Sequence, residues 1–287
     1  MKGINYFLSI MAIAGLSVAC QEKEAFVFVA EGECTETVFV TADSLTYIEV
    51  NYPQASNWDQ APKDKDGYIS LFNGKDFNGW RGYGKDSVPS KWIIEDGAIK
   101  INGSGQGEAH TGNGGDIIFV KKFKNFELLF DWKVSANANS GVLYLAREIK
   151  GEPIWISSPE YQILDNAGHP DAKLGKDGNR QSASLYDMIP ADPQNAKPAG
   201  EWNQGGILVY KGTVVHKQNG ENVAEYHLWT PKWNELIANS KFKPGGDFPL
   251  AYGLLTNLGG DEHEGYIGLQ DHGDDVWYKN IRIKILE

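Results

Sequence analysis

The chain has 287 residues, of which 41% are hydrophobic, and this is enough for one large all-β domain with its own core. Its formal net charge of −11 argues against nucleic acid as a partner, because phosphate binding needs clustered lysine and arginine. The same charge disfavours adhesion to an anionic membrane surface. Nine tryptophans and 13 tyrosines favour a neutral ligand with apolar faces and hydroxyl groups, such as a sugar.

A short apolar run near the start predicts export. A basic beginning precedes apolar residues 6–19, a stretch shorter than the ~20 residues that a membrane-spanning helix needs. The run ends at Cys20 in a sequence that resembles a relaxed bacterial lipobox. We therefore expect a lipoprotein signal peptide over 1–19 and lipidation of Cys20. The exported chain would be attached to the bacterial cell envelope only through that lipid, facing the periplasm or the cell surface. A disulfide between Cys20 and Cys34 is the alternative.

Residues 20–65 differ from the rest of the chain in their pattern of apolar and polar residues. Short β-rich runs, such as residues 38–40, are separated there by acidic and polar residues. We interpret the segment as an N-terminal tether or accessory β segment, and a hairpin, an edge addition to the main sheet and a spacer remain open. A polar linker is expected over residues 57–66.

Residues 66–287 show the pattern of half-buried strands. In residues 126–134 every second residue is apolar, and residues 276–286 repeat this alternation. Turn residues recur between such runs, and only residues 231–240 could form a short helix. Many strands with almost no helix predict one all-β domain, either a two-sheet sandwich or a jelly roll.

One long segment, residues 165–204, interrupts this succession of strands and turns. It is rich in Gly, Asn, Asp and Pro and has few strand signals. Loops longer than about 15 residues in compact domains are usually functional or disordered. This segment carries four side chains that suit a binding site, namely His169, Arg180, Tyr186 and Trp202. We predict one long functional loop here.

The strongest candidate site begins on the strand before this loop. Glu160 and Gln162 share one face of that strand, and His169 follows shortly afterwards. A carboxylate, an amide and an imidazole in one cleft could position a sugar, ligate a metal or transfer protons. The alternative is a solvent-facing strand edge followed by a polar turn.

A second polar cluster lies near the C-terminus. Gln270 and His272 share a strand face, and Asp271 between them could hold an imidazole or face solvent. A third group, which contains His216 and His227, is interpreted as a hairpin with a surface histidine.

Several familiar catalytic signatures are absent from the sequence. The chain contains no G-x-S-x-G serine elbow, no H-E-x-x-H pair and no phosphate-binding glycine loop in a strand–turn–helix context. Serine hydrolase, metalloprotease, kinase and dehydrogenase chemistry are therefore disfavoured, and no nucleotide cofactor is expected.

An ordered set of motifs resembles one known family. The motifs are Leu71–Trp80, Glu160–Asp165, Leu185–Asp187, Gly200–Asn203, Leu269–Gly273 and Val276–Arg282. Together they resemble the 3-keto-disaccharide hydrolase family over residues 66–286. This family is also described as the 3-keto-glucoside 1,2-lyase / 3-keto-2-hydroxy-glucal hydratase family.

The resemblance implies a concanavalin-like jelly roll and action on glycosides that a partner glycoside 3-dehydrogenase has oxidised at C3 of the sugar. It implies that Glu160 and Gln162 line a concave face and that the loop and the late strand complete the centre. The expected catalytic residues are Glu160, His169, Asp271 and His272. The expected substrate-binding residues are Gln162, Tyr144, Arg147, Arg180, Tyr186, Trp202 and Gln270.

Such a substrate defines the chemistry that the site must supply. A ketone at C3 acidifies the proton on C2, so elimination needs a base, an electrophile at the C3 oxygen and an acid at the glycosidic oxygen. A divalent metal ion held by Glu160 and His169 is a further expectation, because it could bridge both oxygens of the intermediate. Two alternatives are kept. One is a non-catalytic carbohydrate-binding surface lipoprotein, and the other is a conventional glycoside hydrolase, which needs two carboxylates about 5–9 Å apart.

Overall fold

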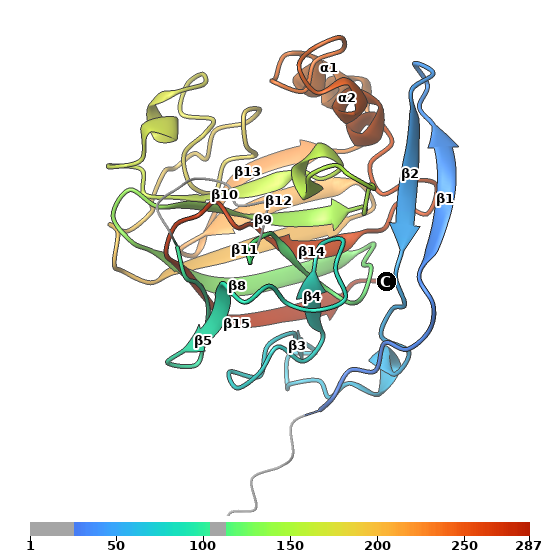
Figure 1. Ribbon diagram of the computed structural model, residues 1–287. Helices are drawn as coiled ribbons and strands as arrows, with labels where there is room; N and C mark the ends of the chain where they lie inside the picture. Colours follow the sequence, from blue (N-terminus) through green and yellow to red (C-terminus); the bar gives the residue numbers. More distant parts are fainter. Residues whose placement is uncertain (1–25, 104–112) are drawn as a thin grey trace, which may run out of the picture.

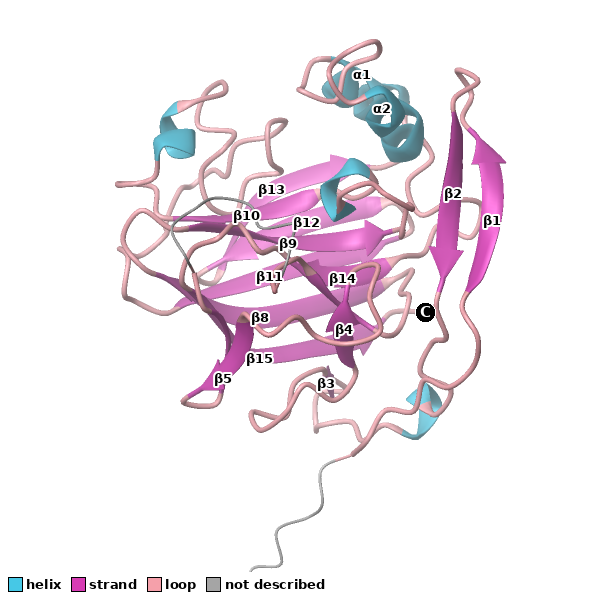
Figure 2. Cartoon of the chain, viewed as in Figure 1, coloured by secondary structure: helices cyan, strands magenta, loops and turns pink. Residues whose placement is uncertain are grey.

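Two antiparallel sheets pack face to face and form the body of the protein (Figures 1 and 2). The computed structural model describes residues 26–103 and 113–287. The smaller sheet has the order β10-β9-β14-β7-β4. Its strands are β4 (Trp80–Gly82), β7 (Ile117–Phe119), β9 (Asn139–Ala146), β10 (Glu160–Leu164) and β14 (Tyr266–Leu269).

The larger sheet has the order β13-β12-β11-β8-β15-β6-β5, and β3 pairs with β15 beside this path. Its strands are β3 (Ile69–Ser70), β5 (Trp92–Glu95), β6 (Ala98–Ile101), β8 (Phe126–Val134), β11 (Asn203–Tyr210), β12 (Thr213–Gln218), β13 (Glu221–His227) and β15 (Val276–Ile285). The expected all-β sandwich is confirmed.

Alternating side chains build the core between the two sheets. In β8, Phe130 and Trp132 are buried while the residues beside them are partly exposed, which is the predicted period of two. Tyr161 of β10 enters the same core from the smaller sheet, with its ring centroid 5.3 Å from that of Phe130. Since Tyr161 points inward, its neighbours Glu160 and Gln162 point to the outer face of the smaller sheet.

A polar network is sealed inside this core. The Nε2 atom of His216 lies 2.7 Å from the Tyr144 hydroxyl, and Nδ1 lies 2.9 Å from the carbonyl oxygen of Ala183. The Tyr144 hydroxyl also contacts that of Tyr226. Tyr144 and His216 are both fully buried. Contrary to expectation, Tyr144 is therefore inaccessible to a substrate and His216 is not on the surface, because both side chains point between the sheets.

Two short α-helices lie at one end of the sandwich (Figure 2). α1 (Pro231–Ala238) is the one helix expected from the sequence, and it begins at Thr230, whose hydroxyl accepts from the Trp233 N–H. α2 (Pro249–Thr256) was not expected, because it is apolar at nearly every position and lacks the pattern of a helix with one exposed face. Three 3₁₀ turns, η1 (Trp58–Gln60), η2 (Ile154–Ile156) and η3 (Pro170–Lys173), lie in loops. In the parts of the chain that the structure describes, none of the helices is long and apolar enough to cross a membrane.

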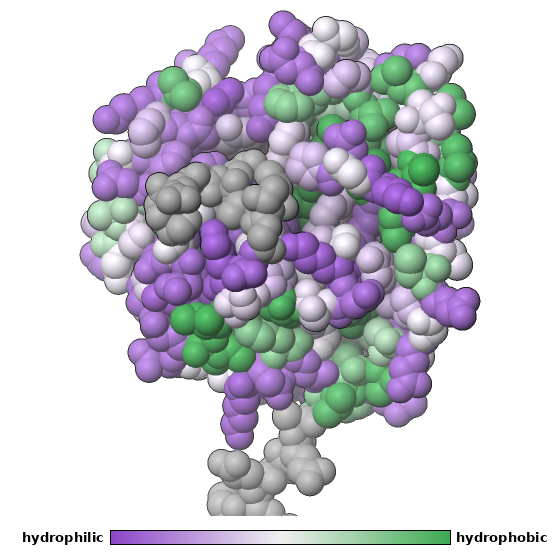
Figure 3. Space-filling model, viewed as in Figure 1, coloured by the Kyte–Doolittle hydropathy of each residue, from purple (hydrophilic) through white to green (hydrophobic). Residues whose placement is uncertain are grey.

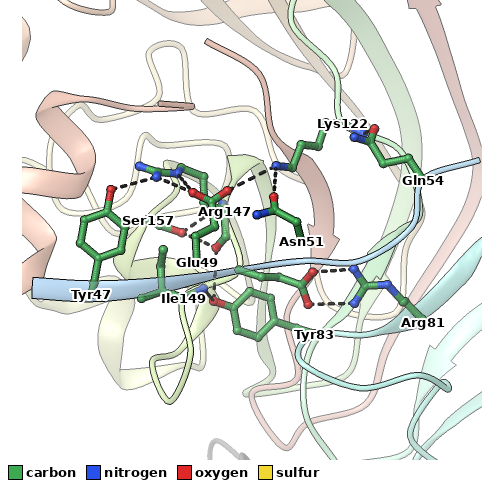
Figure 4. A network of polar contacts seen from close by, with 11 residues as sticks. Tyr47, Glu49, Asn51, Gln54, Arg81, Tyr83, Lys122, Arg147, Ile149 and Ser157 are labelled. Atoms are coloured by element: carbon green, nitrogen blue, oxygen red, sulfur yellow. Dashed lines mark hydrogen bonds and ion pairs between the residues drawn. The ribbon is translucent and has the colours of Figure 1, made fainter. Parts of the chain in front are cut away.

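The N-terminal segment forms a hairpin that is anchored on the side of the sandwich. β1 (Thr35–Val40) pairs with β2 (Thr46–Asn51), and β2 runs along the sandwich edge (Figure 1). The Arg147 side chain donates through Nε to Glu49 at 2.8 Å, as Figure 4 shows. The backbone N–H of Val50 donates to the carbonyl oxygen of Glu148 at 2.8 Å.

The structure departs from two expectations about the N-terminal half of the chain, and a third concerns residues that it does not describe. Arg147 is buried, and its side chain bonds to Glu49 and Tyr47 of the hairpin. It is therefore not the substrate ligand that was expected. The expected polar linker is exposed over residues 62–66, but Trp58 of η1 is buried in the core, with its ring centroid 5.1 Å from that of Phe123. The predicted signal peptide over 1–19 and the lipidation site Cys20 lie outside the described residues.

Candidate active site

The outer face of β10 presents a carboxylate and an amide beside a glycine. Glu160 and Gln162 are 8% and 1% exposed, and Gly141 of β9 is the strand partner of Gln162. A Cβ atom on Gly141 would stand 2.8 Å from the carboxylate carbon of Glu160. Only glycine at this position leaves room for the Glu160 side chain to lie across the sheet.

Two buried amide atoms next to this glycine have no hydrogen-bond partner among the described residues. They are Nε2 of Gln162, which is a donor, and Oε1 of Gln270, which is an acceptor. Gln270 follows β14, and its backbone N–H donates to the carbonyl oxygen of Gly141 at 3.0 Å. Each unpaired buried polar atom costs about 1–3 kcal/mol. A ligand with hydroxyl groups can satisfy both atoms, because a hydroxyl both donates and accepts.

The turn after β10 positions His169. Asp165 accepts from the Asn137 N–H at 2.8 Å, and its carbonyl oxygen accepts from the His169 N–H at 3.0 Å. Gly168 fits closely here, because a Cβ atom would lie 2.5 Å from Asp165 Oδ2. His169 Nδ1 then caps η3 by accepting from the Asp171 N–H at 3.2 Å. Because Nδ1 accepts, the neutral ring carries its proton on Nε2.

His169 meets His272 and Asp274 at the end of the smaller sheet. The two imidazole centroids are 5.8 Å apart and the rings are nearly perpendicular, while His272 Nδ1 lies 3.9 Å from Asp274 Oδ2. One potential ligand atom from each residue lies within 4.8 Å of those of the other two. Burial lowers the pKa of His169 and the neighbouring His272 lowers it further, so His169 is neutral near pH 7. Asp274 was not among the site residues expected from the sequence.

Glu160 and the histidine cluster contact β9 at nearby positions. Asp274 accepts from the Asn139 N–H at 3.0 Å, whereas Glu160 lies over Gly141, two residues further along the strand. Since a strand rises about 3.3 Å per residue, the two anchor points are ~7 Å apart.

Asp271 does not join the cluster, contrary to expectation. It is fully buried, and its carboxylate accepts from the Gly115 N–H at 2.8 Å and from the Gly273 N–H at 2.9 Å. Both oxygens therefore hold the turn that carries His272. Alternation along the chain explains the difference, because Gln270 and His272 point to one side and Asp271 to the other.

Arg180 and Tyr186 brace the long loop, which is confirmed as irregular between β10 and β11. Arg180 donates to Asp187 at 2.7 Å and to Asp171 at 2.9 Å, and the Tyr186 hydroxyl donates to Asp171 at 2.9 Å. Because the Asp171 N–H also bonds to His169, these contacts help to place the histidine. The surface over this loop, at the upper left of Figure 1, is mostly hydrophilic in Figure 3.

Trp155, Tyr186 and Lys241 lie together beside Glu160, and we call these three residues the Trp155 wall. Tyr186 was expected at the site, whereas Trp155 and Lys241 were not. The backbone N–H of Tyr186 donates to the carbonyl oxygen of Glu160 at 3.1 Å, so the two residues lie side by side. The Lys241 ammonium lies 4.5 Å from the centre of the Tyr186 ring and 4.7 Å from that of Trp155. These residues come from three separate loops, so no local motif could have linked them.

Trp202 lies on the other sheet and not at this site. Its ring centre is 4.0 Å from the ammonium of Lys279 on β15 and 5.1 Å from that of Lys133 on β8. A hollow of about 770 Å³ also lies on the outer face of the larger sheet, but none of the predicted site residues lines it. We place the candidate site on the smaller sheet, because the unpaired amides and the histidine cluster are there.

The fold and the site together define an all-β sandwich with a polar, sugar-compatible site on one outer face. Residues 67–284 match the family described as the 3-keto-alpha-glucoside-1,2-lyase-like domain, and the chain belongs to this family. The resemblance seen in the sequence motifs is thereby confirmed.

Similar proteins agree with this membership. A curated relative from Bacteroides thetaiotaomicron, named 3-keto-disaccharide hydrolase, is 58% identical over 297 residues and covers 100% of both chains. The solved structure of a candidate glycosyl hydrolase from Parabacteroides distasonis matches with a TM-score of 0.62 and 30% identity, over 77% of this chain and 95% of that one. A second structure from that organism has a TM-score of 0.56 and 26% identity, over 76% and 99%.

Proposed function

We propose that this protein cleaves 3-keto-disaccharides on the outer face of the smaller sheet. The observation that carries the proposal is the pair of unpartnered buried amide atoms, Gln162 Nε2 and Gln270 Oε1, in the stretch between Glu160 and the histidine cluster. Family membership and the name of the 58%-identical relative support the substrate class.

The ketone at C3 acidifies the proton on C2, so an imidazole side chain is a strong enough base to remove it. A base removes the proton from C2, and the electron pair is held as an enolate on the C3 oxygen. The pair then forms the C1–C2 double bond as the C1–oxygen bond breaks, and the glycosidic oxygen takes a proton and leaves. Water adding across the double bond, with hydroxyl at C1 and a proton at C2, completes a net hydrolysis.

The geometry suggests one role for each group in this scheme. We assign proton removal at C2 to His272, because Asp274 beside its Nδ1 atom favours the tautomer with the proton on Nδ1, in which Nε2 is the basic nitrogen. His169 offers its Nε2–H to the C3 oxygen, where negative charge develops. Glu160, on the other side of the ring position, donates the proton to the leaving oxygen and later activates water.

A divalent cation is a second proposal for the same cluster. Its donors would be His169, His272 and Asp274, which lie within 4.8 Å of one another, in place of the expected Glu160 and His169. Such an ion would polarise the C3 oxygen, which is the role given above to the His169 N–H. Dialysis against a chelator separates the two assignments. If activity survives the dialysis, the His169 N–H polarises the C3 oxygen. If activity is lost and then restored by added cation, the ion has this role.

The deciding experiment compares a 3-keto-disaccharide with its unoxidised parent. The wild-type protein should form products only from the oxidised sugar. His169→Ala and Glu160→Gln should each lower kcat/KM at least ~100-fold while the protein remains folded, with only a small fall in melting temperature for His169→Ala because it removes the η3 cap. Wild-type rates in both variants would remove the site from this face. Cleavage of the unoxidised sugar would identify a conventional glycoside hydrolase, and saturable binding without product would identify a carbohydrate-binding protein.

The proposed substrate also implies a supplier and a place of action. A glycoside 3-dehydrogenase, which oxidises the secondary hydroxyl at C3, is the functional partner that we propose. We also propose that the chain is exported and lipid-anchored to the cell envelope, on the basis of the apolar run before Cys20.

A further inference from the structure

A second hollow lies on the same outer face of the smaller sheet. Its volume is about 620 Å³, which falls within the roughly 300–1,000 Å³ of small-molecule sites. Three aromatic side chains line it, namely Tyr52 after β2, Tyr83 after β4 and Trp155 in η2. Tyr83 and Trp155 pack on the outward-facing side chains of Ile118 and Leu143. Aromatic rings among polar groups suit the apolar faces and hydroxyls of sugar rings.

This hollow adjoins the candidate active site at two places. Gly115 and Asp116 line it, and both bond to Asp271, which immediately precedes His272. Elsewhere its lining includes Trp155, which belongs to the Trp155 wall beside Glu160. A chain of sugars in the active site could therefore continue into the hollow.

The far wall of the hollow comes from the N-terminal hairpin, which precedes the region that the family matches. Glu36 of β1, Val50 of β2 and Tyr52 form this wall. Arg81 fixes the ring of Tyr52 in place, because its guanidinium lies 3.9 Å from the ring centre and donates to Glu148 at 2.8 Å. Figure 4 shows this Arg81 pair beside the ion pairs that hold β2 on the sandwich.

Trp155 contributes an unpaired donor to this region. Its indole nitrogen is buried and has no hydrogen-bond partner among the residues that the structure describes. The ring is fixed by a perpendicular contact with Phe248, whose centroid is 4.8 Å away. An acceptor on a bound ligand would satisfy this N–H.

We propose that the hollow is a subsite for sugars on the leaving-group side of the cleaved bond, and that the N-terminal hairpin exists to complete it. The side follows from the proposed function, on which this inference rests. Glu160 protonates the leaving oxygen, and Glu160 lies beside the Trp155 wall through the bond from the Tyr186 N–H to its carbonyl oxygen, so the leaving sugar extends toward Trp155. The preferred substrate is then a neutral 3-keto-oligosaccharide of three or more units.

The test compares 3-keto-cellobiose with 3-keto-cellotriose, each oxidised on its non-reducing glucose. We expect the wild-type protein to have a kcat/KM at least ~10-fold higher on the trimer, equal to about 1.4 kcal/mol of additional transition-state binding. Tyr52→Leu removes the hairpin ring, and Trp155→Phe removes the indole N–H together with part of the ring surface. Both should bring the trimer-to-dimer ratio toward one, whereas Trp202→Phe on the larger sheet should leave the ratio unchanged.

Two results would overturn the subsite while leaving the proposed function standing. One is an equal kcat/KM on both substrates in the wild-type protein, and the other is an unchanged ratio in both hollow variants with wild-type melting temperatures. If neither sugar is cleaved, the proposed function fails, and calorimetric binding of unoxidised cellotriose still decides the subsite. Binding that weakens about 10-fold in Tyr52→Leu supports it, and absent or unchanged binding rejects it.

Discussion

His272 Nδ1 lies 3.9 Å from Asp274 Oδ2, where the chain after β14 turns back to the start of β9. The same carboxylate oxygen accepts from the Asn139 N–H, so the main chain of β9 restrains the position of Asp274. A carboxylate on this side of an imidazole favours the proton on Nδ1 and leaves Nε2 as a base. Asp274 thus acts as a positioning residue for His272.

Asp274→Asn should lower kcat on a 3-keto-disaccharide about 100-fold, because the ring loses its electrostatic partner. The pKa of His169 should also fall, since the Asp274 charge raises it. The acid limb of the pH–rate profile should therefore move to lower pH in this variant. A lowered melting temperature with wild-type kcat and an unmoved acid limb would show that Asp274 has a purely structural role.

Activity should resist mild acidification. Burial and then His272 lower the pKa of His169 from 6.5, so its neutral form persists to below that pH. Protonation of His169 removes activity as the pH falls through its lowered pKa, so the acid limb that His169 causes in kcat/KM should have its midpoint below pH 6.5. If His169→Gln leaves the acid limb of its residual activity unmoved, the assignment of this limb to His169 is contradicted.

Arg180→Lys should lower kcat/KM about 10-fold without changing the chemistry, because a single ammonium cannot bridge Asp171 and Asp187 as the guanidinium does. His169 would then be less well positioned through Asp171. Arg282→Lys is the matched control, since this exposed arginine lies on the larger sheet, 3.8 Å from Asp64. Steady-state kinetics that respond equally to both changes would contradict the bracing role.

His216 should make the protein sensitive to acid. Burial lowers its pKa to about 4, whereas the unfolded chain has a value of about 6.5. The unfolded state binds more protons between these values, so the free energy of unfolding should fall by about 3 kcal/mol as the pH drops from about 6.5 to about 4.

Below about pH 4 this histidine should cause no further loss of stability. His216→Gln should be less stable at pH 7, because it disrupts the bonds to Tyr144 and Ala183, but its stability should depend less on pH. Urea unfolding of both proteins at a series of pH values provides the measurement. Equal pH slopes in the two proteins would refute the assignment.

Cys20→Ser should abolish labelling of the expressed protein by a radiolabelled fatty acid and release it from the membrane fraction. Cys34→Ser is the control, because Cys34 is exposed in the structure and should not carry lipid. A Cys20–Cys34 disulfide would give a different result. No label would then be incorporated in the wild-type chain, and either substitution would release one titratable thiol.

The sequence by itself determined the fold class, the long loop and the family. A strand exposed on one side repeats every second residue, so the alternation of residues 126–134 and 276–286 could be recognised without knowing the partner strands. The shared face of Glu160 and Gln162 followed from the same local geometry. The helix α2 was missed because its residues are apolar at nearly every position, so the sequence lacks the alternation of polar and apolar faces that reveals a helix.

Only the tertiary structure decided which polar residues meet. It brought Asp274 to His169 and His272, turned Asp271 and Tyr144 inward, and assigned Arg147 to the hairpin and Trp202 to the opposite sheet. These outcomes depend on strand order and on contacts between residues far apart in the chain. Periodicity records which side of its own strand a residue occupies, but it carries no information about the partner that this side will face.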